Sequence, residues 1–111
     1  MPPAYLGEFE HLLLLTVLRL GSAAHGVDIA RELEARAGRR VSRGALYTSL
    51  DRLETKGLLR WKLVAGTPAR DGIARRLYTV TPAGLTALRA SREVLRRMWQ
   101  GLDSVLKERP S

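Results

Sequence analysis

Cysteine is absent from this 111-residue chain, and histidine occurs only twice. The lack of cysteine excludes disulfide bonds, thiolate catalysis, iron–sulfur clusters and cysteine-based zinc sites. His11 and His25 lie far apart in the sequence and supply little for a metal site or a catalytic triad. No glycine spacing typical of a phosphate-binding loop occurs. We therefore expect no metal, no cofactor and no enzymatic activity.

The chain also lacks a long hydrophobic run. The longest one covers residues 12–20 and is interrupted by Thr16 and Arg19, whereas a membrane span needs ~20 apolar residues. Glu8 and Glu10 precede this run, where a signal peptide would carry Lys or Arg. These features predict no membrane association and a cytoplasmic location.

Acidic residues are few compared with basic ones. There are 19 Lys and Arg against 11 Asp and Glu, so the net charge is +8 and the isoelectric point is near 11.0. The excess is concentrated in residues 31–76, which hold twelve basic and five acidic residues. Such a distribution favours a polyanionic partner, with nucleic acid first and an anionic membrane surface second. The alternative is a solvated surface that happens to be rich in arginine.

The spacing of apolar residues predicts three helices, over residues 7–20, 27–37 and 43–56. The first is apolar nearly all round, which indicates burial on two sides, the second of them against a partner chain. The second helix is expected to turn Val27, Ile29 and Leu33 inward. Ser42 is a suitable N-cap for the third helix.

The periodicity then changes to that of strands. Alternating apolar and polar residues predict strands over 59–64 and 75–80, joined by a loop with two Gly and one Pro. Thr81 and Pro82 are expected to begin a last helix that extends to about Lys107. This order predicts a mainly α fold with a small β-hairpin, namely a winged helix-turn-helix domain (residues 1–80) followed by a C-terminal dimerisation helix (residues 81–111).

Two segments carry a resemblance to a known family. Residues 44–58, GALYTSLDRLETKGL, and residues 75–84, RRLYTVTPAG, resemble the two signature blocks of the PadR family of bacterial transcriptional regulators. Ala24-His25-Gly26 matches a weaker point of the pattern, although the family more often has Tyr at the middle position. The resemblance covers about residues 6–90 and implies a ligand-responsive repressor that binds a palindromic operator as a homodimer. The length is similar to the short subfamily, in which one C-terminal helix mediates dimerisation.

The expected DNA-binding residues lie on the third helix and on the hairpin, or wing. On the helix they are Ser42, Arg43, Gly44, Ala45, Tyr47, Thr48 and Arg52, and on the wing they are Lys62, Arg70 and Arg75. Free backbone N–H groups at a helix start attract phosphate, and an arginine there can pair with a guanine edge. The wing cations would contact phosphates without reading sequence. Alternatively, Ser42 only caps, Tyr47 only packs, and the wing is a solvated basic hairpin.

The last helix carries apolar residues at seven-residue intervals. We expect a homodimer interface formed by Leu13, Leu14, Leu88, Leu95, Met98, Trp99, Leu102 and Leu106. The alternative is that this helix folds back on the first helix of its own chain. The resemblance further implies that Trp99 stacks a planar aromatic or phenolic effector at the dimer interface, and the alternative is that Trp99 only packs in that interface. A different class of function, a small-molecule sensor or protein-interaction module without operator binding, stays open.

Overall fold

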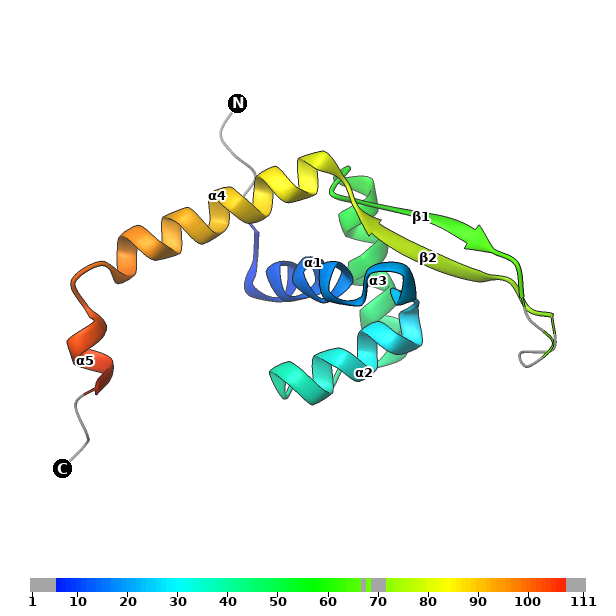
Figure 1. Cartoon of the computed structure of the whole chain (residues 1–111), viewed down its shortest axis with the longest axis horizontal. Coiled ribbons are helices and arrows are strands. Elements are labelled where there is room, and N and C mark those ends of the chain that lie inside the picture. The colour runs from blue at the N-terminus through cyan, green and yellow to red at the C-terminus, as the bar shows by residue number, and fades with distance from the viewer. Residues whose placement is uncertain (1–5, 67, 69–71, 108–111) are drawn as a thin grey trace.

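The computed structural model describes residues 6–66, 68 and 72–107. Three helices, a two-stranded antiparallel sheet and a long helix follow one another along the chain (Figure 1). The helices and strands are α1 Glu8–Leu20, the 3-10 turn η1 Gly21–Ala23, α2 Gly26–Ala37, α3 Arg43–Thr55, β1 Leu59–Val64, β2 Arg75–Val80, α4 Pro82–Trp99 and α5 Asp103–Lys107. The expected fold, mainly helical with one hairpin, is therefore confirmed. Within the described part of the chain, none of the helices has both the length and the apolar character that crossing a membrane requires.

The predicted caps define the helix ends. Ser42 Oγ accepts a hydrogen bond from the Ala45 amide at 3.1 Å, and Thr81 Oγ1 accepts one from the Gly84 amide at 3.0 Å. Both bonds satisfy amide groups that have no partner within the helix. Gly38 ends α2 in the left-handed conformation, with φ 64°, which a residue with a Cβ rarely adopts.

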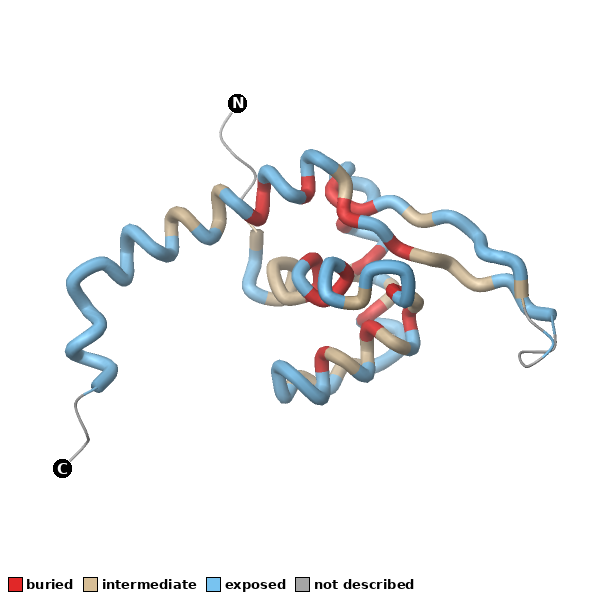
Figure 2. The backbone as a smooth tube through the Cα atoms, in the orientation of Figure 1, coloured by how far each residue is buried: buried red, intermediate tan, exposed pale blue. Residues whose placement is uncertain are grey.

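The core lies where α1, α2, α3 and the hairpin meet (Figure 2). Its fully buried side chains include Leu13 and Leu14, which are both 0% exposed. The expectation that these two residues contact a partner chain is therefore wrong, because their own chain already covers them. Ile29 and Leu33 of α2 are buried, as expected, whereas Val27, which was also expected to point inward, is 58% exposed.

The hairpin is fastened to the turn between α1 and α2. Leu59 lies opposite Val80, and Trp61 opposite Tyr78, so these residues share the inner face of the sheet. The Tyr78 amide donates a hydrogen bond to the Ala24 carbonyl at 2.9 Å. The base of the hairpin is thus fixed relative to the helices.

The last helix is shorter than the sequence predicted. The helix α4 ends at Trp99, and Gly101 then adopts φ 82° before the short helix α5 begins. The repeat of apolar residues hid this break because Leu102 and Leu106 continue the same spacing. Only the first part of α4 packs on the core, and its last buried residue is Leu88. The remainder extends away from the other helices (Figures 1 and 2).

Candidate nucleic-acid interface

The first turn of α3 lies on the surface. Ser42, Arg43, Gly44 and Ala45 are all exposed, and a Cβ built on Gly44 would meet no atom within 4 Å. Arg43 has no carboxylate partner among the described residues, and its guanidinium lies 5.8 Å from the centre of the Tyr47 ring. This turn therefore presents open backbone and an unpaired cation at a helix N-terminus, an arrangement that suits an anion.

The helical period determines which of the other expected DNA-binding residues on α3 are exposed. Gly44, Thr48 and Asp51 form an exposed stripe opposite the buried leucines of the helix. Tyr47 is half-buried, because its hydroxyl packs so closely on Gly26 that a Cβ there would lie 2.2 Å from it. Tyr47 is therefore a packing residue in this structure. Asp51, which the sequence reasoning did not consider, lies on the outward stripe.

Arg52 lies far from the first turn of α3. It follows Arg43 by nine residues, or two and a half turns, and is therefore on the opposite side of α3. Its charge acts instead on Glu10 of α1. Burial alone would raise the pKa of Glu10, but the hydrogen bonds from Lys56 and from the Gly7 amide, together with the nearby positive charges, hold this pKa below its usual value.

Most of the basic residues in the middle of the chain are already paired with acids. The pairs within residues 31–76, or between them and the first helices, are Arg31–Asp28, Arg36–Glu32, Arg39–Glu8, Arg40–Glu34, Lys56–Glu10, Arg75–Asp28 and Arg76–Asp51. Among the described residues of this segment, the cations left without such a partner are Arg43, Arg52, Arg60 and Lys62. Within the described part of residues 31–76, the unpaired positive charge is thus confined to α3 and β1, a much narrower surface than the sequence indicated.

The structure exposes one of the cations expected on the wing, Lys62, and holds another, Arg75, in an ion pair. Arg60 and Lys62 are exposed and alternate with Trp61 along β1, so they share the face of the hairpin that points away from the core. Arg75 is partly buried, its side chain is 19% exposed, and its Nη2 lies 3.2 Å from Asp28 Oδ2. Its expected role as an exposed phosphate contact does not fit this placement, because the guanidinium already holds an anionic partner. Arg70 lies outside the described residues.

Arg76 connects the wing to α3. Its Nη1 lies 3.4 Å from Asp51 Oδ1, and its guanidinium lies 4.1 Å from the centre of the Trp61 ring. The Arg76 carbonyl accepts a hydrogen bond from His25 Nδ1 at 2.8 Å. His25 makes no side-chain cap, and through this bond it ties β2 to the start of α2.

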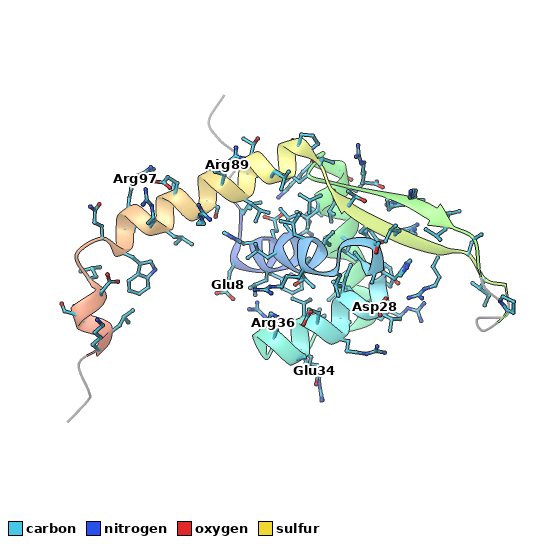
Figure 3. The ribbon with its side chains drawn as sticks, viewed as in Figure 1. Glu8, Asp28, Glu34, Arg36, Arg89 and Arg97 are labelled. Carbon is cyan, nitrogen blue, oxygen red and sulfur yellow. The ribbon has the colours of Figure 1, made fainter. Side chains whose placement is uncertain are left out.

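A second surface is formed by apolar side chains of α4, of α5 and of the link between them. Leu95, Met98, Trp99, Leu102 and Leu106 are all exposed in the single chain, with Leu95 51% and Trp99 44% exposed. Leu88, which belonged to the expected interface, is buried in the core instead. Basic side chains, among them Arg89 and Arg97, project from the outer side of α4 (Figure 3).

Helix α1 contributes to the same side of the molecule. Leu15 and Leu18 are its exposed leucines, and they lie on one stripe with His11. His11 Nδ1 shares a hydrogen bond of 3.0 Å with Ser91 Oγ, which joins α1 to α4. Burial lowers the pKa of His11.

Trp99 also lines a cavity of about 320 Å³ at the break between α4 and α5. The other residues of its wall are Arg96, Arg97, Gln100, Gly101 and Asp103. Apart from Trp99 the wall is polar, unlike the mostly apolar pockets that hold flat aromatic molecules.

Three helices followed by a hairpin, with an exposed third helix, define the class of winged helix-turn-helix proteins. Residues 14–90 match the transcriptional regulator PadR-like family, and the chain belongs to this family. The family consists of transcriptional regulators, which confirms the expectation that the chain is not an enzyme.

Individual relatives agree with this assignment. The chain is 46% identical over 74 residues to the transcriptional regulator Rv3488 of Mycobacterium tuberculosis (strain ATCC 25618 / H37Rv), and the match covers 67% of this chain and 64% of that protein. A PadR-like transcription factor from Bacteroides fragilis shares 28% identity over 89% of this chain and 86% of its own, with a TM-score of 0.61. PadR from Bacillus subtilis, solved in complex with operator DNA, shares the fold at 22% identity, over 74% of this chain and 45% of its own, with a TM-score of 0.61.

Proposed function

We propose that this protein is a homodimeric regulator that binds a palindromic operator with α3 in the major groove and the wing along the backbone. The observation that carries the proposal is the unpaired positive charge, which is confined to α3 and β1 within the described part of residues 31–76. A segment that pairs most of its described cations with acids and leaves these few free is suited to meet phosphates there. The operator complex of Bacillus subtilis PadR supports this reading through the shared fold.

Each part of the surface has a separate role in this proposal. Arg43 contacts a base edge at the entrance of α3, while Gly44 and Ala45 allow the backbone to approach the groove. Arg60 and Lys62 contact phosphates and set the affinity for any duplex. Such a regulator acts where the chromosome is, so we place it in the cytoplasm.

The homodimer is proposed from the apolar side chains that one chain leaves in water. Leu95, Trp99 and Leu102 are about half exposed in the single chain, and Leu15 and Leu18 lie exposed on α1. An exposed apolar surface of this kind marks an interaction site. A second copy of the chain, with its α4 against these residues, buries them and sets the distance between two α3 helices. We assign residues 1–80 to DNA reading and 81–111 to dimerisation, as in the short subfamily.

Salt-dependent DNA binding tests the proposal. Arg60 and Lys62 in both protomers make four phosphate contacts, which corresponds to a slope of about −3.6 when log affinity for a random duplex is plotted against log salt. Selection from genomic fragments with the purified protein would then yield the operator. Absence of salt-dependent retention on any duplex would refute the proposal and favour a sensor or protein-interaction module on the same fold.

The effector role of Trp99 is part of the proposed function as well. A planar aromatic or phenolic molecule that stacks on Trp99 would regulate DNA binding by favouring one spacing of the two α3 helices. Trp99 is 44% exposed in the single chain, so in the proposed dimer its ring would be available to line a space between the two protomers. Quenching of the emission of Trp99, together with a change in operator affinity, tests it, and a Trp99→Phe variant with the same quenching would refute it.

A further inference from the structure

The side chain of Arg76 lies between two groups from different elements. On one side is the carboxylate of Asp51, on the outward stripe of α3, at 3.4 Å. On the other is the ring of Trp61, on β1, at 4.1 Å from ring centre to guanidinium. Asp51 and Arg76 lie 25 residues apart in the sequence, so this contact arises only when the hairpin folds onto α3.

We propose that Arg76 is a positioning residue that clamps the wing to the recognition helix through Asp51, and that this clamp determines operator specificity. The inference rests on the proposed DNA-binding function. An arginine suits the role, because its planar guanidinium can stack on an indole while its N–H groups face a carboxylate. Both partners are fixed, since Trp61 pairs with the buried Tyr78 across the sheet and Asp51 lies on a helix whose other face is in the core.

The clamp is poorly placed to stabilise the fold. The side chains of Arg76 and Asp51 are 40% and 60% exposed, and ion pairs this accessible to water contribute little to stability. Their location on the surface proposed to face DNA gives them a different consequence. If the wing shifts relative to α3, base and phosphate contacts no longer fit the same duplex at once.

Loss of the clamp and simple loss of charge have different effects on DNA binding. Asp51→Asn removes a negative charge from the outward stripe, so it raises affinity for a random-sequence duplex. If charge were the only effect, affinity for the selected operator would rise equally, and the ratio of the two affinities would stay constant. If Asp51 anchors the clamp, the ratio falls by at least about fivefold, the size of one weak base contact.

The experiment compares Arg76→Ala, Asp51→Asn and the double variant with wild type on the operator obtained by genomic selection and on a random duplex. We expect both single variants to lower the ratio, and the double variant to lower it no further, because the two residues act as one unit. The matched control is Arg75→Ala, which breaks the neighbouring ion pair to α2 rather than to α3 and should leave the ratio nearly constant. Thermal unfolding of the Arg76 and Asp51 variants should stay close to that of wild type, because both side chains are exposed.

A spectroscopic measurement checks the geometry without DNA. In a Trp99→Phe background, Trp61 is the sole tryptophan, so Arg76→Ala should change its emission whereas Arg75→Ala should not. Unchanged Trp61 emission in Arg76→Ala, or a ratio that Asp51→Asn leaves constant, would overturn the inference. A ratio that falls with Arg76→Ala alone would show that Arg76 contacts DNA directly, which also overturns it. If wild type binds no duplex at all, the proposed function fails first.

Discussion

Replacing Arg43 by alanine tests whether the first turn of α3 reads the operator. The side chain is exposed and has no carboxylate partner among the described residues, and its contact within the chain is with the Tyr47 ring at 5.8 Å. An exposed cation–π contact of this kind contributes about 0.5–1 kcal/mol. The variant should therefore fold, and an effect on DNA binding can be assigned to the lost contact with DNA.

The expected loss follows from the two-fold symmetry of the proposed complex. One bidentate contact to a guanine contributes about 1–3 kcal/mol of discrimination. Because each half-site holds one Arg43, the operator complex should lose about 2–6 kcal/mol, which is roughly 30-fold to more than 10,000-fold in affinity. A random duplex should lose only the part that comes from charge, so the ratio of operator to random affinity should fall.

Fluorescence anisotropy at several salt concentrations, on both duplexes, measures this ratio directly. The control is Lys62→Ala, which removes a wing cation and should weaken both duplexes alike. It should also make the slope of log affinity against log salt shallower by about 1.8 for the dimer, since each phosphate contact accounts for about 0.9. If Arg43→Ala leaves the ratio constant, or if it behaves like Lys62→Ala, the first turn of α3 does not read bases and the reasoning is wrong.

The remaining predictions concern assembly, packing and pH. Leu95→Glu combined with Leu102→Glu should convert the proposed dimer to a folded monomer. Both side chains are exposed in the single chain, so the new charges disrupt the interface and not the core. An intact dimer in sedimentation would refute the assigned interface. Gly84→Ala should destabilise the fold by about 1–3 kcal/mol in chemical denaturation, since its Cβ would lie 2.3 Å from a backbone oxygen. The control is Gly44→Ala, where the new Cβ has open space and the free energy of unfolding should rise by about 0.5–1 kcal/mol. Equal effects of the two substitutions would contradict this prediction. Because burial lowers the pKa of His11, the unfolded chain protonates more readily, so this contribution to stability is full above about pH 6.5 and is lost as the pH falls below it. Stability curves of wild type and His11→Gln that run parallel between pH 7 and 5 would exclude this coupling.

The sequence by itself determined most of the secondary structure. Helix ends depend on local chemistry, and the residues that supply it, such as Ser42 and Gly38, can be identified in a single chain. The two strands were predicted for the same reason, because alternation along six residues is a local signal. The two segments that resemble the PadR signature blocks predicted membership of that family, and the match over residues 14–90 confirmed it.

The sequence did not determine which side of an apolar helix is covered, or by what. Leu13, Leu14 and Leu88 were assigned to a partner chain, and their own chain buries them. Apolar spacing indicates that a side chain is buried, but it does not indicate which neighbouring element buries it. The break at Gly101 was missed for a related reason, since the leucine spacing continues on both sides of it.

Charge was the other property that only the tertiary structure decided. The sequence shows twelve basic residues between 31 and 76, but it does not show that Arg39 meets Glu8 or that Arg75 meets Asp28, across 31 and 47 residues. Electrostatic energy depends on distance in space, and folding brings together charges that are remote along the chain. The tertiary structure therefore reduced a broad basic segment to a few unpaired cations on α3 and β1, and it placed Arg76 between Asp51 and the wing.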